Sequence, residues 1–101
     1  MRDGIKQACP LCGGPAVYVI DHDPYCKHFH CPTCVEFCID DASETRLKTM
    51  EDEFRVKAST HAKGSNARRL WIIRAPNNAE LALDRSITMR GEFVERGGSS
   101  N

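Results

Sequence analysis

Four of the six cysteines in this 101-residue chain occur in two short motifs whose spacing suits a metal ion. The motifs are Cys9-Pro10-Leu11-Cys12 and Cys31-Pro32-Thr33-Cys34, and residues 13–30 separate them. A tight turn places both thiolates of a Cys-x-x-Cys motif on one side, and two facing turns complete a tetrahedron of sulfur around zinc. The spacing therefore predicts one structural Zn2+ ion bound by Cys9, Cys12, Cys31 and Cys34.

Other uses of these cysteines remain open. Six is an even number, as a disulfide framework requires, although the first residues lack the apolar stretch of an export signal. A redox-active pair would need a free thiol of low pKa at the start of a helix. Four thiolates also suit iron, and the run Cys-Pro-Leu-Cys-Gly resembles the metal-binding turn of rubredoxins.

Two more cysteines and two histidines could form a second group of ligands. Cys26, His28 and His30 alternate along a predicted strand, which points their side chains to one side, and Cys38 lies on the next predicted strand. A shift of one residue in the pairing of these strands decides whether Cys38 joins them. His30 could also replace a cysteine of the first site, whereas the simplest interpretation makes Cys26 and Cys38 small core residues.

The segment from Cys9 to Cys34, with Cys-Pro-x-Cys at each end of a β-rich insert, resembles the zinc ribbon superfamily. This resemblance implies a zinc-bound antiparallel sheet and a role in transcription, in ribosomes or in protein adaptors. A weaker likeness links the chain to the small phage late-gene activators with a four-cysteine zinc site. Those proteins also begin with Cys-Pro-Leu-Cys and continue, after the last ligand, with an apolar strand like Phe37-Cys38-Ile39.

The elements that must position the cysteines follow from local patterns. Residues 16–20, 25–30 and 35–39 are rich in β-branched, aromatic or alternating residues, which predicts a three-stranded antiparallel sheet with the metal at one end. Asp41 and Glu44 have the spacing of a capping box at a helix start. Apolar residues then recur at helical spacing up to residue 58, which predicts one helix, or two with a break near Met50, ending by Gly64.

These elements predict a small single α+β domain, a zinc ribbon followed by a helix and additional strands. We expect a flexible arm at residues 1–8, the zinc ribbon at 9–39, a helical segment with strands packed on the ribbon at 40–96, and a disordered tail at 97–101. Residues 70–73 are predicted to form a buried strand. Residues 79–96 are ambiguous, with a short helix at 80–84 and extended segments at 86–89 and 92–94. The alternative is a ribbon beside a separate helical hairpin.

The charges balance overall but are unevenly distributed. Fourteen basic and fourteen acidic residues give a net charge of zero, which argues against a uniformly basic nucleic-acid coat. Between residues 55 and 74, however, six basic residues occur without an acidic one: Arg55, Lys57, Lys63, Arg68, Arg69 and Arg74. They could follow a phosphate backbone, with Trp71 as a stacking surface, or they could simply be solvated with Trp71 in the core.

No catalytic motif is recognisable, so we expect no enzyme activity. The first hypothesis is a nucleic-acid-associated regulator that binds DNA or RNA through the six basic residues. The alternative is a protein-interaction module, an adaptor or inhibitor of a larger complex, that binds no nucleic acid. No apolar run reaches the length of a membrane helix, and reduced cysteines favour the cytoplasm. The oligomeric state is not predicted.

Overall fold

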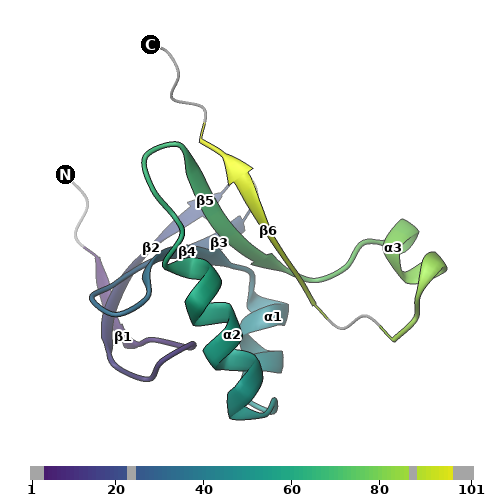
Figure 1. Cartoon of the computed structure of the whole chain (residues 1–101), viewed down its shortest axis with the longest axis horizontal. Helices are drawn as coiled ribbons and strands as arrows, with labels where there is room; N and C mark the ends of the chain where they lie inside the picture. Colours follow the sequence, from purple (N-terminus) through teal and green to yellow (C-terminus); the bar gives the residue numbers. More distant parts are fainter. Residues whose placement is uncertain (1–3, 23–24, 87–88, 97–101) are drawn as a thin grey trace.

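Six strands form one sheet in which neighbours in the chain are also neighbours in space. A computed structural model describes residues 4–22, 25–86 and 89–96 (Figure 1). The strands are β1 (Ile5–Ala8), β2 (Pro15–His22), β3 (Tyr25–Cys31), β4 (Val35–Ile39), β5 (Arg69–Arg74) and β6 (Arg90–Glu95). All neighbouring pairs are antiparallel except β4 and β5, which are parallel.

The predicted three-stranded antiparallel ribbon followed by a helix is therefore wrong, because the sheet is larger and mixed. On one side, Ile5–Ala8, expected to be part of a flexible arm, pairs with β2 as strand β1. On the other side, β5 pairs in parallel with β4, which would otherwise be an edge. A parallel neighbour needs a crossover of a dozen or more residues, and residues 40–68 supply it.

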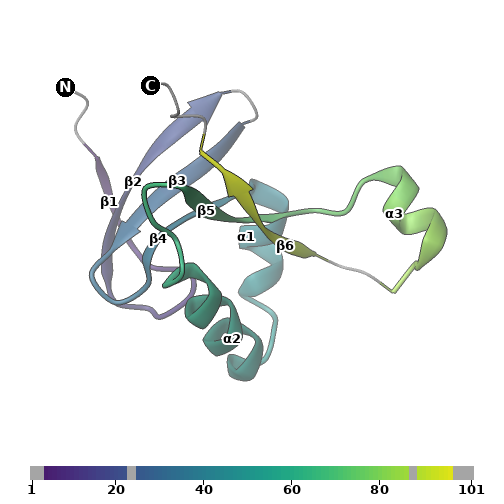
Figure 2. The same cartoon turned by 45° about the horizontal axis from the view of Figure 1, so that its top comes forward.

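Two helices make up this crossover, α1 (Asp41–Leu47) and α2 (Asp52–Ala62), so the two-helix alternative is confirmed. The cap of α1 differs from the prediction: Asp40, not Asp41, accepts a hydrogen bond from the backbone N–H of Ser43 at 2.8 Å. The chain turns between the helices at residues 48–51. Figures 1 and 2 show both helices stacked beside the sheet.

A row of aromatic side chains crosses the sheet beneath the helices. The strand register places Tyr18, Phe29, Phe37, Trp71 and Phe93 opposite one another on five successive strands. Ring centroids are 5.2 Å apart for Tyr18 and Phe29, 5.2 Å for Phe29 and Phe37, and 4.9 Å for Trp71 and Phe93. Leu47 of α1 and Ala58 and Ala62 of α2 belong to the same core. Because α1 and α2 both lie on this face, the opposite face carries no helix among the described residues.

The connection between β5 and β6 extends away from the sheet and contains α3 (Asn78–Leu83) (Figure 2). No residue of α3 is buried. Its Glu80 accepts hydrogen bonds from Arg74 at 2.8 and 3.0 Å, which ties the helix to the end of β5. The short helix and the extended segment at 92–94 are thus found where they were expected. The extended segment expected at 86–89 lies partly outside the described residues, and the tail at 97–101 lies wholly outside them.

Candidate metal centre

The first metal-binding turn joins β1 to β2. Cys9 donates its backbone N–H to the carbonyl of Gly14 at 2.8 Å, and Gly13 donates to the carbonyl of Cys9 at 2.8 Å. Gly13 has a φ of 77°, a left-handed conformation that only glycine adopts without strain. Beyond it, the N–H of Gly14 lies 3.4 Å from Sγ of Cys12, as a donor to the sulfur.

The second turn joins β3 to β4 and repeats this geometry. Val35, directly after Cys34, has a φ of 73°, so the residue after the second cysteine is left-handed in both turns. The backbone N–H groups of Cys34 and Thr33 act on the thiol of Cys31 so as to lower its pKa. A β-branched residue at positive φ is strained, and such strain persists where the surrounding structure requires it. The two turns are therefore built alike although their sequences differ.

The four cysteines meet on the face of the sheet that the helices cover. Their sulfur atoms all lie within 4.8 Å of one another, with 3.8 Å between Cys9 and Cys34 and 3.5 Å between Cys12 and Cys31. Sulfur atoms about 2.3 Å from a central zinc ion, at the corners of a tetrahedron, would lie about 3.8 Å apart. No disulfide joins any of the six cysteines. The four sulfurs are thus positioned to bind one metal ion, as predicted.

Helix α2 contributes a contact to this centre that sequence reasoning missed. The hydroxyl of Ser59 lies 3.0 Å from Sγ of Cys34, and both side chains are buried. Metal ligands are commonly oriented by such outer hydrogen bonds. A serine inside a helix gives no signal of this role in the sequence, since the contact depends on how α2 packs on β4.

The pKa values of the cysteines in this cluster show how far the thiols resist ionisation when no cation is bound. Burial raises the pKa of Cys9 far above its usual value, and it raises the pKa of Cys34 to about 11 despite the hydrogen bond with Ser59. At Cys31 burial also opposes ionisation, but the N–H groups of Cys34 and Thr33 outweigh it and lower the pKa. Metal binding to these thiols must therefore release protons.

The six basic residues proposed to contact nucleic acid are dispersed. Arg55 donates hydrogen bonds to the carbonyls of Leu47 and Met50 at 2.6 and 2.8 Å and forms an ion pair with Asp52. Its side chain therefore satisfies carbonyl groups at the C-terminal end of α1 and just beyond it. Arg74 is held by Glu80 and by Glu92 in the β5–β6 arm.

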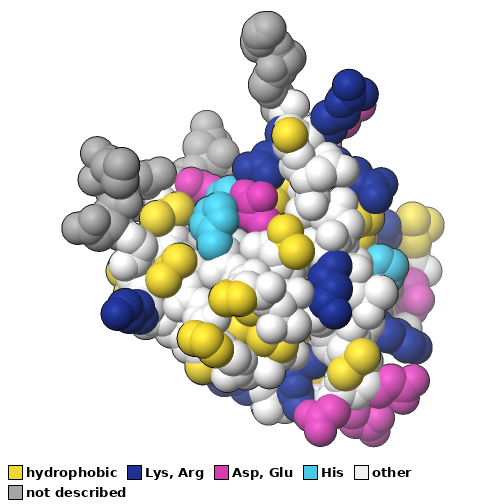
Figure 3. All heavy atoms as spheres, turned by 60° about the vertical axis from the view of Figure 1, so that its left-hand side comes forward, with side chains coloured by type: hydrophobic (Ala, Val, Ile, Leu, Met, Phe, Trp, Pro, Cys, Tyr) yellow, Lys and Arg dark blue, Asp and Glu magenta, His cyan; other side chains and the backbone are white. Residues whose placement is uncertain are grey.

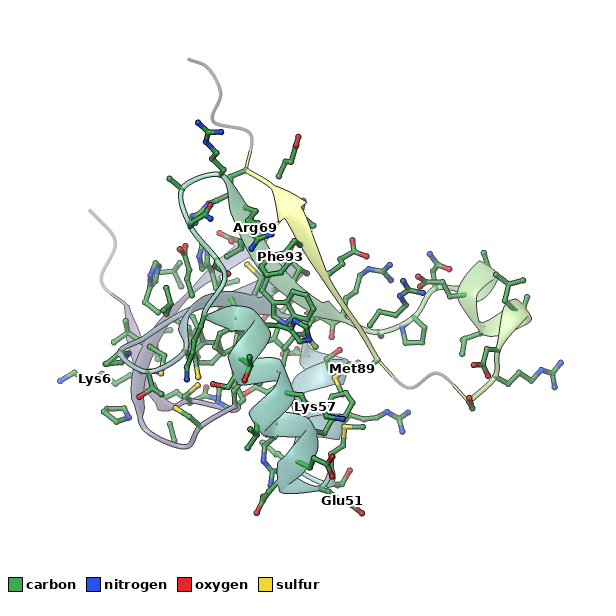
Figure 4. All side chains as sticks on the ribbon, viewed as in Figure 1. Lys6, Glu51, Lys57, Arg69, Met89 and Phe93 are labelled. Carbon is green, nitrogen blue, oxygen red and sulfur yellow. The ribbon has the colours of Figure 1, made fainter. Side chains whose placement is uncertain are left out.

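The remaining four, Lys57, Lys63, Arg68 and Arg69, are exposed. Figure 4 shows Lys57 projecting from α2, well apart from Arg69, whose guanidinium lies 4.0 Å from the centre of the Phe93 ring. Trp71 is buried and stacks on His61 with ring centroids 4.5 Å apart, so it offers no exposed stacking surface.

The other cysteines and histidines lie apart from the four-cysteine cluster. The register places His28 opposite Cys38, so Cys26, His28 and Cys38 share the face without helices. His30 is exposed on that face and is not part of the cluster. The four-cysteine set therefore needs no histidine to complete it.

No helix in the described parts of the chain has both the length and the apolar character required to span a bilayer. Comparison with known proteins finds no matching family model, no matching curated protein and no matching solved structure. Of the resemblance to zinc ribbons, what stands is the four-cysteine cluster itself, compatible with a zinc site.

Proposed function

We propose that this protein is a non-enzymatic, protein-binding module stabilised by a structural zinc ion in the four-cysteine centre. The four-cysteine cluster supports the first part, since four thiolates in a tetrahedron suit zinc and leave no position for water or substrate. A centre of this kind stabilises a fold rather than catalysing a reaction. Reduced thiols also suit the cytoplasm, where disulfides are rare.

The proposed binding surface is a shallow apolar hollow beside the two metal-binding turns, on the face without helices. Its apolar lining comes from Pro15, Ala16, Val17, Pro32 and Val35, with Lys6 and His30 among the polar residues. Val17 and Val35 are 36% and 45% exposed. Figure 3 views this side, where hydrophobic side chains gather below a group of histidine and carboxylate side chains.

An extended apolar segment of a partner protein fits this surface best. Strand β1 is one of the two edge strands of the sheet and has no strand partner on its outer edge among residues 4–22, 25–86 and 89–96. Such an edge can accept an added strand through main-chain hydrogen bonds. The hollow lies directly beside β1 and offers apolar contacts for alternate side chains of the added segment.

A displayed library of random linear peptides tests this proposal. We expect selection on the zinc-loaded protein to enrich peptides in which apolar and polar residues alternate. Val17→Lys should abolish their binding, because it places a charge in the hollow. Val56→Lys on α2 is the matched control, since Val56 is 62% exposed and lies outside the hollow. Failure to enrich such peptides, or equal binding by both variants, would contradict the proposal.

Nucleic-acid binding is the second candidate, favoured by the exposed basic residues Lys63, Arg68 and Arg69 around the loop that follows α2. The readout is fluorescence anisotropy with mixed-sequence DNA and RNA at several salt concentrations. Each phosphate contact adds about 0.9 to the slope of log K against log salt for duplex DNA, so Arg68→Ala with Arg69→Ala should reduce the slope by about 2. Lys6→Ala, on β1, is the control. Binding that is absent at low salt would exclude this candidate.

A further inference from the structure

Four side chains able to bind a metal lie together on the face without helices, away from the centre described above. Asp21 is on β2, Cys26 and His28 are on β3, and Cys38 is on β4. In the register, Asp21 pairs with Cys26 and His28 pairs with Cys38. Directly paired residues point to the same face, and residues two apart in a strand do so as well, so all four side chains share one side.

Ligand atoms of three of these four side chains are close enough to share one ion. One ligand atom each from Asp21, His28 and Cys38 lies within 4.8 Å of the others. Cys26 lies outside this group of three, and its thiol and that of Cys38 are close enough to affect each other's pKa. Nδ1 of His28 faces Oδ2 of Asp21 at 3.4 Å. The donors that already lie together are therefore one sulfur, one imidazole nitrogen and one carboxylate oxygen, and the thiol of Cys26 is the neighbouring group that we assign as the fourth ligand.

The ring of His28 is held as a metal-binding histidine usually is. Its Nε2 lies 2.6 Å from Oε2 of Glu36, so that carboxylate can accept a hydrogen bond from Nε2–H, which leaves Nδ1 free to bind an ion. A carboxylate on the outer nitrogen is the usual partner of a metal-bound imidazole. Glu36 is itself fixed by Arg96, which donates to both carboxylate oxygens at 2.8 Å.

The two cysteines are placed to bind an ion rather than to form a disulfide. They are buried, at 8% and 3% exposure. They are also diagonal neighbours, because Cys38 pairs with His28 rather than with Cys26. Diagonal residues on adjacent strands are about 7–8 Å apart, beyond the span that a disulfide bridges easily. Burial raises the pKa of both thiols, so a cation is needed to hold them as thiolates.

We propose that Asp21, Cys26, His28 and Cys38 form a second metal site, for one divalent cation that accepts both sulfur and nitrogen ligands, such as zinc. The site is independent of the four-cysteine centre. Cys26 is about 16 Å along β3 from Cys31, at about 3.3 Å per residue, and the two point to opposite faces. Asp21 is the most exposed of the four side chains that we assign to the site, which gives the ion a route from solvent.

Titration of the metal-free full chain with Co2+ tests the proposal, because Co2+ replaces zinc and absorbs light when bound to thiolates. We expect two equivalents to bind, confirmed by native mass spectrometry with zinc. In Cys38→Ser we expect one equivalent. The thiolate-to-cobalt absorbance at saturation should fall by about a third, since about two of six bound thiolates are lost. The His28→Gln variant should also bind one equivalent. It tests the same site without removing a buried cysteine, so the result does not depend on whether the Cys38→Ser variant folds.

His30→Gln is the matched control. His30 lies on the same strand and stacks on His28 with ring centroids 4.9 Å apart, and with His28 and Glu36 it forms a different group of potential ligands, outside the proposed site. This variant should keep two equivalents. The proposal is overturned if the unaltered chain binds one equivalent at saturation, because Asp21, His28 and Glu36 would then form only an ion-pair network. It is also overturned if His30→Gln loses the second ion while Cys38→Ser keeps it, or if Cys26 and Cys38 are found oxidised to a disulfide.

Discussion

Replacing Gly13 by alanine tests whether the four-cysteine centre depends on the left-handed backbone of its first turn. Gly13 has a φ of 77°, and a Cβ built there would meet no atom within 4 Å. The substitution therefore adds backbone strain without a steric clash. A left-handed conformation costs a non-glycine residue about 1–2 kcal/mol. Alanine recovers about 0.4–1 kcal/mol by restricting the unfolded chain. We expect the free energy of unfolding of the metal-bound protein to fall by about 1 kcal/mol.

Because metal binding and folding are coupled, this loss should also appear as about a fivefold weaker affinity for zinc. The assay is competition with a chromophoric chelator at constant pH, together with denaturant unfolding of the loaded protein. Gly14→Ala is the control, since Gly14 has no positive φ and its added Cβ would lie 3.5 Å from Sγ of Cys12, an ordinary contact. Equal losses in the two variants, or zinc affinity unchanged in Gly13→Ala, would refute the reasoning.

Three further changes test other parts of the structure. Cys31→Ser should remove the four-cysteine metal ion and the cooperative thermal transition, measured by circular dichroism, because metal binding contributes free energy of folding; a variant that keeps both contradicts this. Arg74→Gln should raise the pKa of Glu80 from about 2 towards 4.5, followed by NMR of the carboxyl carbon, because Arg74 hydrogen-bonds that carboxylate. Because the pKa of Glu80 is lowered, this contact stabilises the fold above pH 4.5 and ceases to do so as the pH falls to about 2. If the substitution leaves the titration of Glu80 unchanged, the contact does not hold the carboxylate as described. Gly91→Ala should lower the free energy of unfolding by about 1–3 kcal/mol, measured with denaturant, because its Cβ would overlap the ring of Trp71; an unchanged midpoint would mean that the ring moves aside at no cost.

The metal centre could be predicted from the sequence because its determinants are local. Each Cys-Pro-x-Cys motif is a turn in itself, and Gly13 carries the positive φ that the first turn requires. The second turn also requires a positive φ, at Val35, but a valine in the sequence does not indicate a left-handed backbone. Ser59 was equally hidden, because its contact with Cys34 arises only after α2 packs on the sheet.

The extent of the sheet could not be predicted, because it depends on pairing between distant segments. Ile5–Ala8 has two polar residues among four, and its strand character comes from pairing with β2. The parallel pairing of β4 with β5 joins Phe37 to Trp71 across the whole helical crossover. Charge patterning was misleading for a similar reason, since Arg55 and Arg74 are occupied by partners that the linear sequence does not place beside them.

The parallel junction between β4 and β5 has a consequence for the order in which the chain can assemble. Pairing Phe37 with Trp71 closes a loop of about 33 residues, which costs about 3 kcal/mol of chain entropy by the logarithmic law for flexible loops. Strands β1 to β4 are joined only by short connections, two of which are held together by the four cysteines. A metal ion bound by the four cysteines would therefore stabilise the half of the protein that forms through contacts between neighbouring segments. That half presents the edge of β4, with which the distant strand β5 can then pair.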